Sequence, residues 1–339
     1  MTGNLKTANG TMKTIRYFSA ALLAAALLAA CGGGGSCGAG SAGSRTASDA
    51  SDASRAAAAH RLAIPRPPAA LATDSARLAY VAEHYWDAFD FRDTTWIADT
   101  AALEQTYANF LGVILSMPPE QTARVQRRLV DSAAVCPAMY DRFVGVCDRY
   151  LDDPNSPMRS EEHYIRLLEA QIASPNVDEA YKIAPRGRLE TALKNRPGTL
   201  AADFNYTTAS GRTGRLSKLR GEHTLLLFYT PGCPDCARVE RYIADSKILA
   251  PLIASHRMAM LAVYVDGDLG AWRAHLSQMP AGWTVGCDPA QAINDRKLYA
   301  LPAIPNLYLL DKDKRVIFKD APVERIEAWL AAQNRETGR

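Results

Sequence analysis

The sequence predicts an all-α region over residues 73–196, followed by an α/β region over residues 197–339. In the first region, apolar residues recur at the spacing of amphipathic helices between short polar or Pro-containing breaks. In the second region, residues 224–229 form a continuous apolar run, which is typical of a strand that a parallel or mixed sheet buries on both faces. The chain has 339 residues, which is enough for two domains of ordinary size.

Composition and charge exclude some classes of function. Hydrophobic residues make up 48% of the chain and charged residues 22%, an ordinary globular composition that argues against wholesale disorder. The chain has 39 Lys and Arg against 36 Asp and Glu, which leaves a formal charge of +3. Nucleic-acid-binding domains usually carry a strongly basic face, so we expect no nucleic-acid partner.

Residues 1–30 have the pattern of a secretory signal peptide. Lys13 and Arg16 precede an apolar run over residues 17–30 that is too short to cross a bilayer comfortably as a helix. The run ends in Leu-Ala-Ala-Cys31, which resembles the bacterial lipobox. This resemblance implies that Cys31 is lipidated and becomes the first residue of the mature protein. The alternative is an Ala-rich signal that is cleaved elsewhere, with Cys31 incidental.

Residues 31–72 predict a flexible linker between the lipid anchor and the folded body. The segment is rich in Gly, Ser and Ala up to residue 59 and then Pro-rich over residues 64–68, so its first part is a flexible coil and its second part is stiffer. No acidic residue directly follows Cys31. We therefore expect a lipid-anchored protein of the bacterial cell envelope that faces the periplasm.

The α region over residues 73–196 predicts an antiparallel bundle or an irregular helical domain of unknown function. Apolar stripes at helical spacing run over residues 75–86, 103–115, 122–134, 138–151 and 161–172. The aromatic cluster over residues 85–96 is expected in the core. His84 and His163 are interpreted as structural histidines, because no second histidine at the spacing of a helical metal site follows the Glu161-Glu162-His163 segment.

Cys136 and Cys147 leave a structural question open. Eleven positions apart on one helix, with a rise of about 1.5 Å per residue, they would lie beyond disulfide reach. Pro137 can begin a new helix and change this geometry, so a disulfide between them remains a possibility. Cys287 is predicted to be a buried, inert thiol.

A C-x-x-C motif directly follows the apolar run. Cys233-Pro-Asp-Cys236 comes after Thr-Pro-Gly and opens an amphipathic stretch over residues 237–248. A helix N-terminus stabilises the thiolate of Cys233, and Cys236 is within disulfide reach but more shielded. A zinc site lacks two further ligands, and a c-type haem site needs a histidine where the chain has Ala237. An inert structural disulfide is the other alternative.

These motifs, in this order, resemble thioredoxin-fold proteins, specifically the envelope-located TlpA/ResA-like branch that is related to the AhpC/TSA family. The matching segments are an N-terminal extension over residues 202–221, the active-site strand and turn over 228–236, a parallel strand over 261–266, a proline turn with its strand over 303–311, a hairpin strand over 315–319 and a closing helix over 323–332. The whole arrangement resembles a group of uncharacterised envelope lipoproteins in which a helical domain precedes a thioredoxin-like domain.

The resemblance implies thiol-disulfide exchange in which Cys233 is the nucleophile and Cys236 the resolving cysteine, with no cofactor and no metal. It implies that Pro305 is a cis proline facing the pair, and that Ile304 presents its backbone to an incoming substrate strand. Pro234 and Tyr229 complete the expected substrate surface. The expected partners are protein disulfides or dithiols and an envelope redox partner, with reduction or isomerisation preferred.

Two departures and two alternatives qualify this expectation. Leu227 stands six residues before Cys233, where cytosolic thioredoxins carry a buried acid, and Asp235 opposes thiolate formation by like charge. We therefore expect a pair that is less oxidising than one with a histidine between its cysteines.

A thiol peroxidase is one alternative, because Thr230 precedes Cys233 at the spacing of a peroxidatic turn, although Leu226 replaces the expected proline. A binding module that recruits an envelope partner and uses the fold as a scaffold is the other.

Overall fold

The protein is described by a computed structural model that covers residues 60–336. The predicted signal peptide, the lipidation site Cys31 and the linker up to residue 59 lie outside the described residues. Within the described range, no helix has the length and apolar character needed to cross a membrane.

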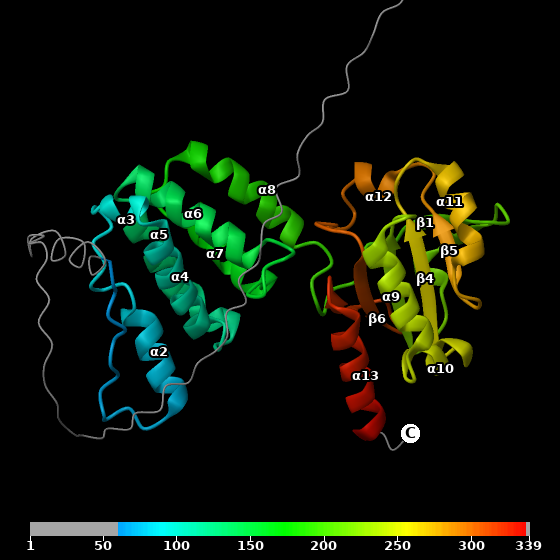
Figure 1. The fold of residues 1–339 in the computed structure, drawn as a ribbon, viewed down its shortest axis with the longest axis horizontal. Coiled ribbons are helices and arrows are strands. Elements are labelled where there is room, and N and C mark those ends of the chain that lie inside the picture. Colours follow the sequence, from blue (N-terminus) through cyan, green and yellow to red (C-terminus); the bar gives the residue numbers. More distant parts are fainter. Residues whose placement is uncertain (1–59, 337–339) are drawn as a thin grey trace, which may run out of the picture. The chain divides into compact units, whose positions relative to one another are not determined.

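The all-α region contains each of the predicted helices and adds two more (Figure 1). Its helices are α2 (Asp74–His84), α3 (Thr95–Ala98), α4 (Thr100–Ile114), α5 (Pro119–Ala133), α6 (Pro137–Leu151), α7 (Glu161–Ala173) and α8 (Ile183–Ala192), with a 3-10 turn, η1 (Glu179–Lys182), before α8. Helices α5 and α6 begin at prolines, because a residue without an N–H loses nothing in the first turn and its φ suits a helix.

The predicted aromatic core of this region is confirmed. Tyr85, Trp86, Phe89, Phe91 and Trp96 are all at most 7% exposed. The ring of Trp86 meets those of Phe110 and Phe143 edge-on, each with its centroid 5.3 Å away. Edge-to-face pairs of this kind stabilise a core beyond the area that they bury.

The segment from residue 60 to residue 72, predicted as the end of the linker, lies against the helices instead. His60 hydrogen-bonds through its two ring nitrogens to Asp99, at 3.0 Å, and to Thr95, at 2.9 Å. Leu62 packs against the apolar core. Residues 60–72 therefore belong to the folded part of the described chain although they have no regular secondary structure, because contacts with side chains about 40 positions away hold them.

The α/β region is built on a seven-stranded sheet in the order β2-β1-β5-β4-β3-β6-β7. Its strands are β1 (Asn205–Thr208), β2 (Thr213–Arg215), β3 (His223–Tyr229), β4 (Met258–Tyr264), β5 (Thr284–Cys287), β6 (Asn306–Asp311) and β7 (Val316–Lys319). Strand β3 pairs parallel with β4 and antiparallel with β6, so the predicted apolar run is a central strand of a mixed sheet.

Helices and loops cover both faces of this sheet (Figure 1). The helices are α9 (Pro234–Asp245), α10 (Leu249–Ala254), α11 (Leu269–His275), α12 (Ala292–Asp295) and α13 (Val323–Glu336). Along β3, Leu225, Leu227 and Tyr229 pack with α9, α10, α11 and α13. Leu226 and Phe228 point to the opposite face, because successive side chains of a strand alternate.

A buried lysine on β7 forms an ion pair and hydrogen bonds with residues of the helical segments. Lys319, whose side chain is 3% exposed, lies 2.9 Å from a carboxylate oxygen of Glu161 at the start of α7. Its ammonium also donates hydrogen bonds to the carbonyls of Ala192, at 2.8 Å, and Lys194, at 2.7 Å. All three donors of the ammonium are thus satisfied, which is the condition for burying such a charge.

Candidate active site

The two cysteines of the C-x-x-C motif lie where β3 ends and α9 begins. Gly232 has φ +76°, a left-handed conformation that favours glycine, and it turns the chain out of the strand. Cys233 is the N-cap of α9 and Pro234 its first residue. The Sγ of Cys233 accepts a hydrogen bond from the backbone N–H of Cys236 at 3.3 Å, so the sulfur faces the open amide groups of the helix.

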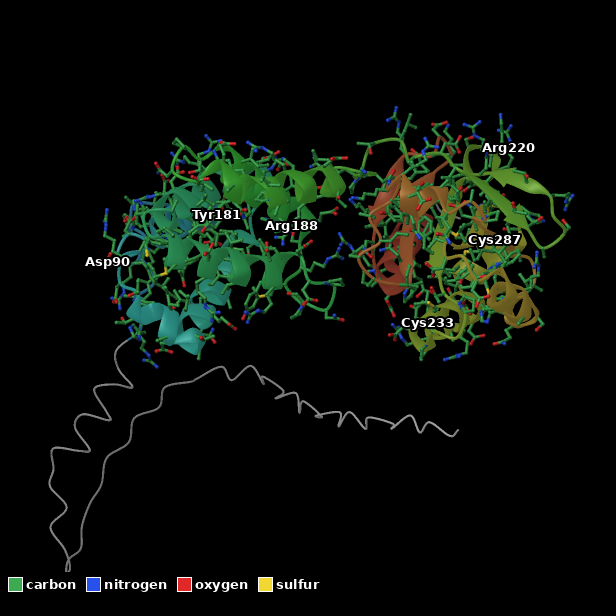
Figure 2. The ribbon with its side chains drawn as sticks, turned by 90° about the horizontal axis from the view of Figure 1, so that it is seen from above. Asp90, Tyr181, Arg188, Arg220, Cys233 and Cys287 are labelled. Carbon is green, nitrogen blue, oxygen red and sulfur yellow. The ribbon has the colours of Figure 1, made fainter. Side chains whose placement is uncertain are left out.

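The two thiols differ in accessibility. Figure 2 labels Cys233, which lies at the edge of the α/β region. Cys233 is half-buried, Cys236 is only 1% exposed, and both are free thiols. Burial, the hydrogen bond with Cys233 and the nearby charge of Glu240 raise the pKa of Cys236 to about 12. Cys236 is therefore a protonated thiol at neutral pH, and Cys233 is the sulfur that an external disulfide can reach.

A second chain segment, far away in sequence, lies beside this turn. Phe228 pairs with Asn306, so the two residues that precede β6 stand next to the end of β3. The peptide bond between those residues, Ile304 and Pro305, is cis, as the sequence resemblance implies. The fold therefore brings the proline turn to the same edge of the sheet as the cysteines.

A cavity of about 1030 Å³ opens at this edge. Ligand-binding clefts commonly have this size. Its lining includes Asp235 and Arg238 of α9, Ala303 to Pro305, residues 317–325, Pro197, and residues within 154–162, which span the loop before α7 and the start of that helix. Acidic, basic and apolar side chains all line the cavity, so both polar and apolar groups of a ligand could be bound there.

The predicted substrate residues do not all reach this cavity. Ile304 and Pro305 are half-buried and line it, and Pro234 is exposed at the start of α9. Tyr229 is 0% exposed, so the expectation that it forms part of the substrate surface is corrected. As the last residue of β3, it takes the inward-facing position in the alternation of that strand and packs beneath α9 and α11.

One buried ionisable residue of α9 was not predicted from the sequence to belong to the site. Glu240 is 6% exposed and lies on the buried face of α9 with Cys236, Val239 and Ile243. The spacing 236, 239, 240, 243 is that of a helix face turned to a core, so the periodicity of the amphipathic stretch contains the signal.

The remaining described thiols are unpaired. Cys136 and Cys147 are both free thiols, so no disulfide joins them in the structure. Pro137 does begin a helix, α6, with Cys136 as its N-cap, while Cys147 lies in the core with its pKa raised by burial to about 12. Cys287 is 2% exposed at the end of β5, and burial raises its pKa as well.

The two histidines of the α region have ordinary structural contacts. His84 lies 2.7 Å from Asp87 on the surface. The Nδ1 of His163 accepts a hydrogen bond from the Ser160 hydroxyl at 2.8 Å, and its Nε2 faces the carbonyls of Ile114 and Met117 at 3.1 and 3.2 Å. Because carbonyl oxygens only accept hydrogen bonds, these two contacts indicate that the neutral imidazole of His163 carries its proton on Nε2.

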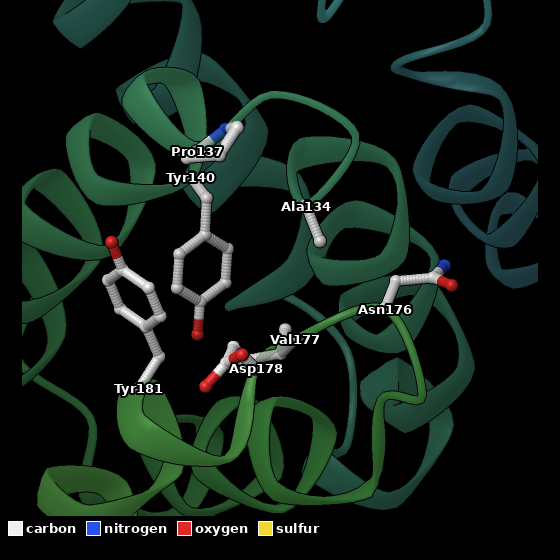
Figure 3. Close-up of a pocket in the computed structure, with 7 residues that line it drawn as sticks. All are labelled: Ala134, Pro137, Tyr140, Asn176, Val177, Asp178 and Tyr181. Carbon is white, nitrogen blue, oxygen red and sulfur yellow. The ribbon is translucent and has the colours of Figure 1, made fainter.

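A small cavity in the α region is too tight for a ligand of cofactor size. Its volume is about 90 Å³, and Figure 3 shows the ring of Tyr140 standing beside that of Tyr181, with Asp178 below them. Clefts for organic ligands usually exceed about 300 Å³, and one water takes about 30 Å³ in the liquid. The cavity has room for a few waters.

The geometry and the topology define a class of protein: a thioredoxin-like α/β domain, with a dithiol at the start of a helix, preceded by a helical region. Residues 37–195 match the family described as a domain of unknown function (DUF5106), and residues 197–319 match the AhpC/TSA family. A crystal structure of a thioredoxin-like protein from Bacteroides caccae covers 80% of this chain and is itself covered to 98%, with 37% identity and a TM-score of 0.77. The chain belongs to this family of thioredoxin-like proteins.

Two further similarities concern the C-terminal part. The C-terminal domain of an uncharacterized protein from Bacteroides fragilis is 39% identical, covering 40% of this chain and 98% of that domain, with a TM-score of 0.40. Nucleoredoxin from Bos taurus is 27% identical over 118 residues, which is 34% of this chain and 26% of nucleoredoxin. The chain thus spans about a quarter of the length of the curated relatives that it matches.

Proposed function

We propose that the protein is a thiol-disulfide oxidoreductase in which Cys233 is the nucleophile and Cys236 the resolving cysteine. The observation that carries this proposal is the contrast between the two sulfurs: one is accessible at a helix N-terminus, and the other is buried one turn further on. Helix N-termini favour the thiolate, which is the form that attacks disulfides. The family membership supports the same function.

In the reductive direction, the thiolate of Cys233 attacks one sulfur of a client disulfide. A bond from Cys233 to that sulfur forms, the client S–S bond breaks, and the other client sulfur leaves as a thiolate. The sulfur of Cys236 then attacks Cys233 and expels the second client sulfur. The client gains two electrons, and the protein dithiol becomes a disulfide, which an envelope redox partner reduces again.

The substrates that fit the site best are protein disulfides. Ile304 and Pro305 line a cavity of about 1030 Å³, which supports binding of a polypeptide segment there, and the backbone of Ile304 would pair with that segment by β-addition. Reduction or isomerisation is preferred over oxidation, because Asp235 between the cysteines disfavours a strongly stabilised thiolate.

Trapping tests the assignment of the two cysteines. Cys236→Ala leaves a nucleophile without a resolving thiol, so client proteins should accumulate as mixed disulfides on Cys233 that dissociate under reduction. The matched control, Cys233→Ser with Cys236→Ala, should trap nothing. The purified wild type should also reduce insulin. The proposal fails if the single variant traps no partner in envelope extracts and the wild type leaves insulin disulfides intact.

We also propose that the protein is anchored in the cell envelope by a lipid on Cys31. The support is the sequence pattern, because a small-residue run ends at this cysteine behind a basic flank. Cys31→Ala should move the protein from the membrane fraction to the soluble fraction and remove the mass of the lipid. Cys37→Ala is the matched control and should stay in the membrane fraction. Equal partition of both variants and the wild type would contradict the anchor.

A second candidate function is recruitment of an envelope partner by the α region. Its support is a set of apolar side chains on η1 and its neighbours that are unusually exposed: Ile183 at 69%, Tyr181 at 45% and Leu193 at 42%. A variant with both Cys233→Ser and Cys236→Ser distinguishes the two functions. If that variant still complements a deletion, binding is the main function, and exchange chemistry is not.

A further inference from the structure

A buried carboxyl group lies behind the resolving thiol. Glu240 follows Cys236 by four residues on α9, and both belong to the face of that helix that packs onto the sheet. Side chains at this spacing are neighbours, with about 5–6 Å between their Cβ atoms. Glu240 is only 6% exposed, and a carboxylate at such a depth is costly unless another group compensates its charge.

The group that faces this carboxyl is His275, the last residue of α11. Its Nε2 lies 3.8 Å from Oε2 of Glu240, too far for a hydrogen bond, and is itself buried without a hydrogen-bond partner among the described residues. The other carboxylate oxygen, Oε1, is buried and has no hydrogen-bond partner among the described residues. Buried oxygens are normally satisfied, so an unpaired one next to a reactive thiol calls for a functional explanation.

Other groups that face this carboxyl come from β3 and α9. The ring of Tyr229 lies 5.8 Å from the ring of His275, and its hydroxyl is also buried without a partner among the described residues. Arg241 and His275 lower the pKa of Glu240, but burial outweighs them and raises it overall. The charge of Glu240 contributes in turn to the raised pKa of Cys236.

These relations couple two acids of the same site. A negative charge on Glu240 opposes a negative charge on the sulfur of Cys236, so the pair favours states that carry a single negative charge. When Cys236 loses its proton, a protonated Glu240 removes the repulsion. Strand β3 offers no such group, because the position six residues before Cys233 is held by Leu227, which is 0% exposed.

We propose that Glu240 accepts the proton that Cys236 releases when its sulfur resolves the mixed disulfide. This inference rests on the proposed exchange function and names a further residue in it. The Cys236 S–H bond breaks as the bond to the sulfur of Cys233 forms, the client sulfur leaves with the electron pair of its bond to Cys233, and the proton moves to Glu240 and then to solvent. In the reverse direction, Glu240 returns the proton to Cys236.

The two steps can be timed separately with 5,5′-dithiobis(2-nitrobenzoate) as the disulfide. Attack by Cys233 releases one coloured thiolate, and resolution by Cys236 releases the second from the same site. In the wild type, the logarithm of the second rate should rise with pH and then level off where Glu240 has lost its proton. In Glu240→Gln, this rate should fall at least about tenfold at pH 7, since general-base catalysis typically contributes about 100-fold or more.

The pH profile distinguishes proton transfer from a structural effect. Without an internal base, the second rate in Glu240→Gln should rise about tenfold per pH unit from pH 6 to pH 9, because hydroxide must remove the proton. The first rate should stay within about twofold of wild type. Glu190→Gln, an exposed glutamate on α8, is the matched control and should match wild type in both phases and both profiles.

The outcomes separate the two proposals. If the first phase is absent in the wild type, the proposed exchange function fails. If the first phase is normal and the second keeps the wild-type profile in Glu240→Gln, exchange stands, and the role of Glu240 is refuted. Should Glu240→Gln fail to fold, His275→Phe provides the test. His275 lowers the pKa of Glu240, so without it Glu240 should lose its proton at higher pH, and the pH at which the second rate levels off should rise. If the pH at which the second rate levels off does not change, the assignment of Glu240 as the proton acceptor is refuted.

Discussion

The backbone N–H of Cys236 donates a hydrogen bond to the Sγ of Cys233 at 3.3 Å, so the two residues of the redox pair are in contact in the dithiol form. A helix begins at the nucleophile, and its first free amides point at the sulfur on which charge develops. We therefore expect exchange between dithiol and disulfide to need little movement of the backbone.

Asp235 should slow the first step. Its carboxylate lies in the first turn of α9, 3.7 Å from Arg238. A like charge near a sulfur opposes the negative charge that develops on it during attack. Asp235→Asn should therefore speed the first phase of the aromatic disulfide reaction by about threefold at low salt, as expected for one partly screened charge near a surface. Asp245→Asn, at the other end of the same helix, is the control and should leave this rate unchanged. Equal rates for wild type and Asp235→Asn would contradict the prediction.

His163 should make the stability of the α region depend on pH. Burial lowers its pKa, so between its folded value and the ordinary value of 6.5 the unfolded chain binds the proton and the folded protein does not. Its contribution to stability is thus present above pH 6.5 and is lost as the pH falls, with a slope of at most about 1.4 kcal/mol per pH unit. Urea unfolding at pH 5, 6 and 7 measures this dependence.

The histidine contributions are separable. His163→Gln should have a flatter dependence of the unfolding free energy on pH than wild type. His223, at the start of β3, has a pKa lowered by burial as well, so its contribution has the same sign. The variant with both histidines replaced should be flattest. If His163→Gln keeps the full wild-type slope, the prediction is wrong.

Removing the buried ammonium of Lys319 should destabilise the protein strongly. Lys319→Met leaves the carboxylate of Glu161, whose side chain is 24% exposed, without its partner. Breaking a buried pair from one side typically costs about 3–5 kcal/mol. Adding Glu161→Leu should recover part of this loss, because the unpaired charge is then gone, although the carbonyls of Ala192 and Lys194 still lack their donor. Strictly additive losses in thermal or urea unfolding would contradict this coupling.

Alkylation of the native, reduced protein should rank the described cysteines by burial. A short iodoacetamide pulse followed by peptide mapping should label Cys233 first, while Cys147 and Cys287, both 2% exposed, should react only after unfolding. Cys236 should be protected with them, because it is 1% exposed and its thiol is protonated at neutral pH. Rapid labelling of Cys236 in the folded state would contradict the division of roles between the two active-site thiols.

Local patterns were sufficient to predict most elements of the fold. Helix α8 escaped a specific prediction because it contains Pro185 and Gly187 and buries few residues, so it carries no clear apolar stripe. The packing of residues 60–72 against the helices could not be predicted for a related reason: these residues have no periodicity, and contacts with distant side chains such as Asp99 hold them.

The redox pair was visible in the linear chain, because a buried strand, a glycine turn and a helix N-cap are consecutive and follow from short-range preferences. Contacts between segments far apart in the sequence depend instead on strand register and helix packing. Which way Tyr229 points, and whether a histidine on α11 meets a glutamate on α9, depends on the register of β3 and on how helices pack over it. Such packing joins residues that no motif links, so the burial of Tyr229 and the Glu240–His275 pair emerged only once the chain was folded.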